Sequence, residues 1–138
     1  MEQKTSNEIA VDQMPDLADT IARYRLAYLM TTSDKGSPHV VPVDVMMEGG
    51  ELVVDGIGRH TRENASARPV VGMVWPPQSE SDYSLIVDGQ AVVNGERLRI
   101  TPTRAVLHRS DPAREPKPSG GCASDCVEVA LGYGQTAR

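Results

Sequence analysis

The sequence predicts a mainly β domain of the α+β class, in which about six short antiparallel strands close into a barrel flanked by short helices. Two observations lead to this prediction. Short apolar segments rich in Val, Leu and Ile recur along the chain, and glycine-containing turns separate them, as in a meander of antiparallel strands. Closing such a sheet removes exposed strand edges, and a barrel is the expected result.

The bulk composition sets limits on the class of protein. The chain has 138 residues and is expected to form a single domain over 1–138, with enough chain for a hydrophobic core. Its net charge of -5 gives no general attraction to nucleic acid or to anionic membranes. No apolar run is long enough to cross a bilayer, and the N-terminus lacks the apolar segment of a signal peptide. We therefore expect a cytoplasmic protein without nucleic-acid or membrane partners.

The first part of the chain predicts one helix and a three-stranded meander. Residues 1–13 are polar, and we expect them to be frayed. A helix is predicted over Pro15–Tyr24, because apolar residues recur there at helical spacing. The strands expected next are Ala27–Thr32, His39–Met47 and Glu51–Asp55. Pro42 within the second strand indicates an edge, a bulge or a bend.

The second part predicts a short helix over Thr61–Ala67, ended by Pro69, and then further strands. The strands expected are Val70–Trp75, Tyr83–Val93, Arg97–Ile100 with an apolar continuation to Leu107, and Val127–Val129. Gly89 is expected to bend its strand, and Asn94-Gly95 is a strong hairpin signal. Residues 111–126 are rich in Pro, Gly and charge and are expected to be loop-like.

A candidate anion-binding segment joins two of the predicted strands. Gly56 and Gly58 form a Gly-x-Gly turn, and the polar run Arg59–Arg62 (Arg-His-Thr-Arg) follows where the helix is expected to begin. Glycines let the backbone approach a ligand closely, and the positive end of a helix favours an anion. Arg, His and Thr side chains add hydrogen-bond donors. The segment is either a phosphate cradle or a solvated basic surface loop.

The order and sequences of these elements resemble a known family. The segments that carry the resemblance are Ala27–Thr32, the run Gly36-Ser37-Pro38-His39-Val40-Val41-Pro42-Val43, Leu52–Val54, Arg68–Val74 and Ile86–Val93. Over about Leu26–Val93 the chain is similar to the flavin-binding split β-barrel family related to pyridoxamine 5′-phosphate oxidase. That family also contains deazaflavin-dependent reductases and haem-degrading relatives. The resemblance implies a six-stranded antiparallel split β-barrel with short flanking helices.

The resemblance also implies a cofactor, its site and an assembly. In such proteins FMN binds at the interface of a homodimer, the strand matching Val41–Val45 runs beside the isoalloxazine ring, and the loop matching Gly58–Arg62 holds the phosphate. The usual lysine is missing from this loop and Glu63 lies nearby, which leaves open a weak or altered phosphate site. The basic C-terminal segment of the vitamin-pathway oxidase is also missing, so we do not expect pyridoxamine phosphate oxidase activity.

The candidate cofactor-binding residues come from the ring-contacting strand, the phosphate loop and the single Trp. They are Val41, Pro42, Val43, Asp44, Gly58, Arg59, His60, Thr61, Arg62 and Trp75. Trp75 would stack on the cofactor or cap the dimer interface, with core packing as the alternative. His39 is either a pocket residue or a surface strand residue. Cys122 and Cys126 are too few for a structural zinc site, which needs four ligands, and no metal site is predicted.

The leading functional hypothesis is an FMN-binding oxidoreductase that acts on a small molecule, with the flavin supplying the redox chemistry. No side chain is a convincing acid, base or nucleophile, so catalytic residues stay unassigned and enzymatic activity is not settled by the sequence. Three alternatives stay open. They are non-catalytic flavin binding, use of a deazaflavin, and haem binding through an axial ligand such as His39, His60 or His108.

Overall fold

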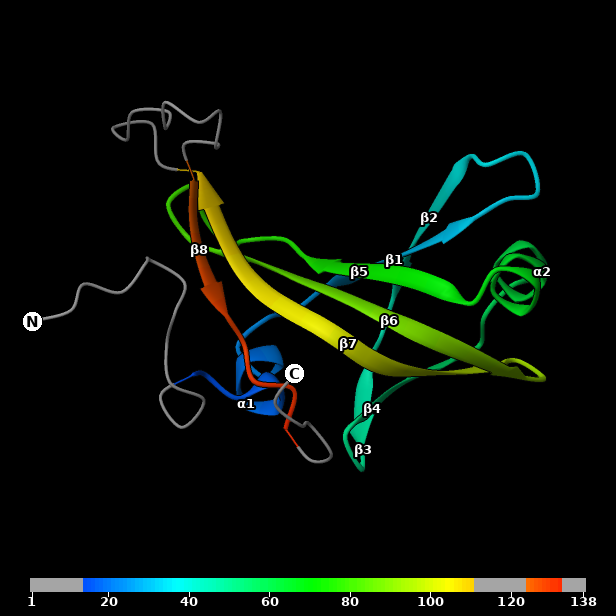
Figure 1. The fold of residues 1–138 in the computed structure, drawn as a ribbon, viewed down its shortest axis with the longest axis horizontal. Helices are drawn as coiled ribbons and strands as arrows, with labels where there is room; N and C mark the ends of the chain where they lie inside the picture. Colours follow the sequence, from blue (N-terminus) through cyan, green and yellow to red (C-terminus); the bar gives the residue numbers. More distant parts are fainter. Residues whose placement is uncertain (1–13, 111–123, 133–138) are drawn as a thin grey trace, which may run out of the picture.

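The fold is a curled antiparallel sheet with two short helices (Figure 1). The computed structural model describes residues 14–110 and 124–132. The elements are α1 (Leu17–Ile21), β1 (Ala27–Thr32), β2 (Pro38–Val43), β3 (Met46–Glu48), β4 (Glu51–Asp55), α2 (Arg59–Ala67), β5 (Val70–Trp75), β6 (Ser84–Asn94), β7 (Arg97–Ser110) and β8 (Ser124–Glu128). Neither helix of this described part is long and apolar enough to cross a membrane.

The sheet has the strand order β2-β1-β5-β6-β7-β4-β3, and β8 pairs with β7. Every strand pairing is antiparallel. The two edge strands β2 and β3 are consecutive in the chain, with only Asp44 and Val45 between them. Because the chain passes directly from one edge to the other, the sheet must curl until these edges approach each other. The predicted fold class, a mainly β split barrel with short flanking helices, is confirmed.

The strand expected over His39–Met47 is two strands, because β2 pairs with β1 whereas β3 pairs with β4. With this division and with β8, the described sheet has eight strands instead of the six expected. Pro42 lies opposite Tyr28 in an edge strand, where its missing amide hydrogen breaks no sheet ladder. The edge position was one of the three predicted for this proline.

The helix predicted over Pro15–Tyr24 is too long, since α1 has five residues. Asp16 caps it by accepting a hydrogen bond from the amide of Asp19 at 3.2 Å. The chain leaves the α conformation soon afterwards, and the amide of Arg23 donates to the carbonyl of Thr20 at 3.1 Å, an i to i+3 bond that tightens the last turn. Spacing of apolar residues therefore overestimated the length of this helix.

The C-terminal part of the described chain contains a strand where a loop was expected. Residues 124–126 belong to β8 and not to a loop, because β8 pairs with β7 along Ser124–Glu128. The strand expected over Val127–Val129 thus begins three residues earlier. Nothing in the polar run Ser124-Asp125-Cys126 signals a strand by alternation, and only the neighbouring β7 edge selects it. The other calls on this region, residues 111–123 with Cys122, and the frayed residues 1–13 lie outside the described residues.

The interior is aliphatic, as the scarcity of aromatic residues requires. The most completely buried large side chains are Leu17, Leu29, Leu52, Met73, Leu85, Leu98 and Ile100. Along β1 buried and half-buried residues alternate, as expected for a strand with one face toward the core. Trp75, with 2% of its surface exposed, joins this core.

The helix α2 lies at one end of the sheet, beside the ends of β5 and β6 (Figure 1). It begins at Arg59, two residues before the predicted start at Thr61. Two side-chain hydrogen bonds fix it to β1: the amide of the Asn64 side chain donates to the Thr31 hydroxyl at 3.1 Å, and Nε of Arg68 donates to the Thr32 carbonyl at 2.7 Å. These contacts hold the N-terminus of α2 in a fixed place relative to β2, which pairs with β1.

Gly89 lies at an irregularity of the β6–β7 hairpin, where the pairing register shifts between Asp88 and Gly89. A Cβ atom at this position would lie 2.5 Å from Cγ2 of Ile100 and 2.8 Å from the carbonyl oxygen of Thr101. Neither contact is tolerable, and one of them involves backbone. The bend predicted for Gly89 is therefore a bulge that also requires the absence of a side chain.

We expect Gly89→Ala to lower the free energy of unfolding by about 2 kcal/mol, the cost of overpacking a close contact. The matched control is Gly72→Ala in the neighbouring strand β5, where the new methyl group would meet only Cε of Met30 at 3.5 Å and the Val87 carbonyl at 4.0 Å. Urea denaturation of both variants measures the difference. Equal stabilities would show that the β6–β7 hairpin can shift to accept a side chain.

Candidate functional site

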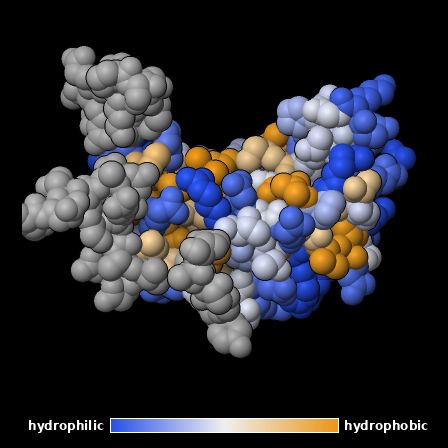
Figure 2. Space-filling model, in the orientation of Figure 1, coloured by the Kyte–Doolittle hydropathy of each residue, from blue (hydrophilic) through white to orange (hydrophobic). Residues whose placement is uncertain are grey.

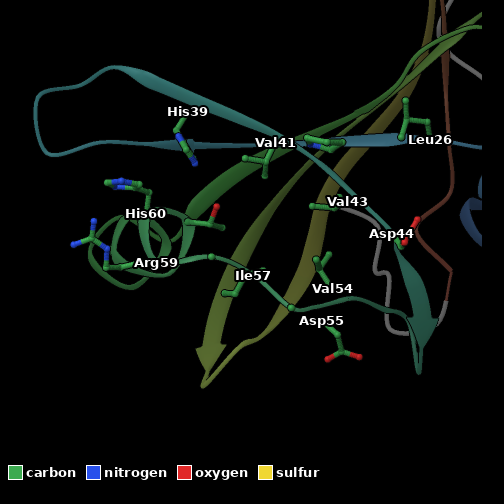
Figure 3. Close-up of a pocket in the computed structure, with 14 residues that line it drawn as sticks. Leu26, His39, Val41, Val43, Asp44, Val54, Asp55, Ile57, Arg59 and His60 are labelled. Carbon is green, nitrogen blue, oxygen red and sulfur yellow. The ribbon is translucent and has the colours of Figure 1, made fainter.

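A hollow of about 430 Å³ lies between β2 and the segment that joins β4 to α2 (Figure 3). It is lined by Leu26, His39, Val41, Pro42, Val43, Asp44, Val54, Asp55, Gly56, Ile57, Gly58, Arg59, His60 and Thr61. Its size is within the range of about 300–1,000 Å³ that is usual for small-molecule sites. Eight of the ten candidate residues therefore come together in one place, since Arg62 and Trp75 are the two that do not line it.

One wall of the hollow is apolar because of strand alternation in β2. Val41 and Val43 are half-buried, whereas Val40 and Pro42 are exposed. Alternate residues of a strand face opposite sides, so the two half-buried valines point the same way. Figure 3 shows them directed into the space above Val54. This wall offers a planar, apolar ligand a surface for contact.

The other end of the hollow is polar because α2 begins there. Gly56 has φ +76° and makes the turn out of β4, and Gly58 is the N-cap, without a side-chain cap hydrogen bond. The first helical amide bond is donated by Arg62 to the Gly58 carbonyl at 3.0 Å. The amides that precede it in α2 have no intrahelical acceptor. They belong to residues that line the hollow, where their partial positive charge favours an anion.

Two histidines from different elements lie at this polar end. His39 extends from β2 and His60 from α2, and their ring centroids are 5.9 Å apart with an interplanar angle of 56°. Figure 3 shows the side chains of these residues and of Arg59 grouped away from the valines. His39, which the sequence left as either a pocket residue or a surface residue, is half-buried and lines the hollow. The sequence carried a signal for it, because His39 shares the alternation of Val41.

Two candidate residues lie apart from the hollow. The Arg62 guanidinium turns back along α2, with Nη1 donating to the Ile57 carbonyl at 3.4 Å. Trp75 is packed in the core and borders a separate hollow of about 270 Å³, which is also lined by Val43 and Asp44. Arg62 carries the positive charge that a phosphate site needs, but it does not line the hollow. Its spacing in the sequence did not reveal this.

Asp55 lines the hollow near the Gly56 turn, and its carboxylate is paired with Arg97. Its two carboxylate oxygens accept hydrogen bonds from Arg97 at 2.7 and 3.1 Å. This hydrogen bonding is the main reason that the pKa of Asp55 lies below its ordinary value, and the positive charges of Arg97 and Arg99 act in the same direction. Because the folded pKa is lowered, the associated stability is present above the unfolded pKa and is lost as pH falls through the folded pKa.

We expect Arg97→Gln to raise the pKa of the Asp55 carboxyl toward its ordinary value, since the bidentate partner is removed. A titration of the side-chain carboxyl carbon by NMR measures this. The control is Arg104→Gln on the same strand, because Arg104 pairs with Glu128 at 3.5 Å instead. An unchanged Asp55 titration in Arg97→Gln would mean that the ion pair is not formed in solution.

No group of three or more His, Cys, Asp or Glu side chains within 14–110 and 124–132 is arranged to hold a metal ion. Cys126 lies in β8 opposite His108 of β7. The second cysteine considered with it, Cys122, is outside the described part of the chain.

Comparisons with known proteins agree with this architecture. No model of a known protein family matches the chain. It is 37% identical over 131 residues to uncharacterised proteins of Mycobacterium bovis and Mycobacterium tuberculosis, and the match covers 83% of this chain and 92% of each relative.

Solved structures with low sequence identity share the fold. A candidate pyridoxamine 5′-phosphate oxidase of Listeria innocua superimposes with a TM-score of 0.55 at 16% identity, over 67% of this chain and 98% of that one. A FAD-binding protein of Mesorhizobium loti gives 0.54 at 16% identity, over 64% and 86%. A haem-binding protein of Mycobacterium smegmatis gives 0.53 at 13% identity, over 63% and 50%.

The chain therefore belongs to the same family as the two uncharacterised mycobacterial proteins, and it shares the split β-barrel fold of the solved structures. Of these structural neighbours, one is described as FAD-binding and another as haem-binding. The resemblance stated from the sequence is confirmed at the level of the fold.

Proposed function

We propose that this protein binds FMN in the hollow beside β2 and works as an oxidoreductase on a small molecule. The observation that carries the proposal is the polarity of the hollow: an apolar wall at Val41 and Val43 faces one way, and a polar end with Arg59 and His60 lies at the start of α2. A flavin mononucleotide has the same division, with a flat ring system at one end and a phosphate at the other.

The position of β2 at the edge of the sheet supports the placement of the ring. β2 pairs with β1 and ends the strand order, so alternate backbone N–H and C=O groups point away from the sheet. Because Pro42 faces away from β1, its C=O and the backbone groups of Asp44 are the ones near the apolar wall that would bond the polar edge of an isoalloxazine ring. Pro42 has no N–H to offer. When bound, the flavin would supply the hydride or electron transfer, and these residues would bind and orient it.

The phosphate would lie at the start of α2. The amide groups of the first helical turn and the Arg59 side chain would donate to it, and charge-assisted bonds of this kind are the stronger ones. The loop carries no lysine, so Arg59 is the cation of the loop that lines the hollow. Arg62, which is bonded to the Ile57 carbonyl, has no such role.

A visible absorption spectrum of the purified protein tests the cofactor. It is recorded before and after addition of FMN and removal of the excess. A retained flavin spectrum supports the proposal, and turnover of reduced nicotinamide with an electron acceptor then separates an enzyme from a non-catalytic flavin binder. If the protein does not retain FMN but binds a deazaflavin or haem, that cofactor would take the place of FMN in the proposal. For haem, His39 and His60 line the hollow, whereas His108 lies on β7.

Arg59→Ala is expected to weaken FMN binding by about tenfold or more, the loss of one charge-assisted hydrogen bond. Riboflavin, which has no phosphate, should bind equally well to the variant and to the wild type. Arg62→Ala is the matched control and should leave both affinities unchanged. Fluorescence quenching of each flavin gives the dissociation constants. If Arg59→Ala weakens the binding of FMN and of riboflavin by similar factors, the phosphate does not bind at this end of the hollow.

We further propose that two copies of the chain form a homodimer with the cofactor sites at their interface. The support for a dimer is a set of exposed apolar side chains at the hollow and on the two edge strands. Leu26 borders the hollow and is 43% exposed, and Val40 and Met46, on the two edge strands, are 52% and 51% exposed. A second copy would cover them. The face seen in Figure 2 carries its hydrophobic residues in several separate groups, which gives no reason to place the interface there.

Sedimentation analysis tests the dimer. We expect twice the mass of the chain for the wild type and a shift toward monomer for Val40→Lys, because a buried unpaired charge is costly. A monomeric wild-type protein that still binds FMN would refute the assembly without affecting the cofactor proposal.

A further inference from the structure

A second hollow adjoins the first one at its polar end. It has a volume of about 450 Å³ and is lined by Ser33, Asp34, Ser37, Pro38, His39, His60, Glu63, Asn64 and Arg68. His39 and His60 are the two residues that line both hollows. Neither histidine is buried, and neither belongs to the hydrophobic core. The fold thus places two imidazoles together at a junction between two hollows without using them for packing.

We propose that His39 and His60, from two different elements, both donate to the terminal anionic group of the ligand, a phosphate monoester that lies beside the pair of rings at this junction. The inference rests on the proposed function and names a binding residue, His39, that comes from outside the loop at the start of α2. His60 approaches the anion from the helix, and His39 approaches it from β2.

The chemistry of the two rings fits this role. A neutral imidazole has one N–H donor, and an imidazolium has two donors and a positive charge. With their centroids 5.9 Å apart and their planes tilted by 56°, the rings are in contact with each other, and an anion that lies beside the pair is within reach of both. A protonated pair without an anion would repel itself, so the bound phosphate and the protons on the rings stabilise each other.

The surrounding charges modulate this coupling. Arg59 and Arg68 favour the anion, whereas Asp34 and Glu63 favour protonated rings, and all four line one of the two hollows. Asp44 and Asp55 line the first hollow as well, but Asp55 is neutralised by its ion pair with Arg97. Binding of a phosphate monoester should therefore strengthen as pH falls from about 8 to about 6.5, the range in which histidine gains a proton. Binding of an uncharged flavin should not.

The experiment measures dissociation constants of FMN and riboflavin by fluorescence quenching, at several pH values in that range. The variants are His39→Gln, His60→Gln and the double variant, and His108→Gln on β7 is the matched control. Each single variant should bind FMN about tenfold more weakly near pH 6.5, and the double variant should lose the pH dependence. Riboflavin affinity should stay constant in all of them, which also shows that they are folded.

Three results would overturn the inference. If the wild type binds FMN but His39→Gln keeps its affinity and its pH dependence, His39 does not hold the phosphate, while the proposed function stands. If His39→Gln weakens both flavins equally, the residue has a structural role. If the wild type binds neither flavin at any of these pH values, the proposed function and this inference fail together.

Discussion

The short passage of the chain from β2 to β3 is the constraint on which this structure depends. Two residues, Asp44 and Val45, connect strands at opposite ends of the sheet order, and they hold Val43 and Met46 within about 10 Å of each other. A sheet whose first and last strands are joined so closely has to curl. The core forms on the inside of that curl, where aliphatic side chains from β1, β5, β6 and β7 meet.

The hollow is a consequence of the same connection. The edges are joined at Asp44–Val45, and β2 faces the β4–α2 segment across the hollow (Figure 3). Its walls differ in chemistry because they come from different kinds of structure. An edge strand contributes alternating valines and free backbone groups, and a helix start contributes amide groups, an arginine and a histidine. A ligand with an apolar ring system and a charged end matches this arrangement. The hydrogen bonds of Asn64 and Arg68 to β1 hold the two walls in a fixed position relative to each other.

Charged residues near the hollow have distinct tasks. Arg97 forms an ion pair with Asp55, and Arg99 forms ion pairs with Glu48 and Glu51. The opposite charges on the β4–β7 surface therefore balance one another. The Arg62 side chain donates a hydrogen bond to the Ile57 carbonyl. Arg59 lines the hollow together with His39 and His60. The electrostatics of the polar end thus depend on few side chains.

The class of fold, the order of the elements and most of the residues of the hollow could be predicted from the sequence. Local signals carried these: the short apolar segments, the alternation of polar and apolar residues in Arg97–Ile100, the turn glycines, the Gly-x-Gly segment before α2, and the run Gly36–Val43. It also identified Gly89 as a bend. What it could not give was the division of His39–Met47 into two strands, because that depends on which partner each half pairs with.

The tertiary structure also decided which side chains share the hollow. His39 and His60 are distant in sequence and meet only because β2 and α2 are both anchored to β1. Arg62 and Trp75 had suitable chemistry, but the rotation of a helix and the packing of the core directed them elsewhere. Residues 124–126 became a strand because the edge of β7 was available. Spacing along a chain fixes which face of its own element a residue occupies, and only packing between elements determines what that face meets.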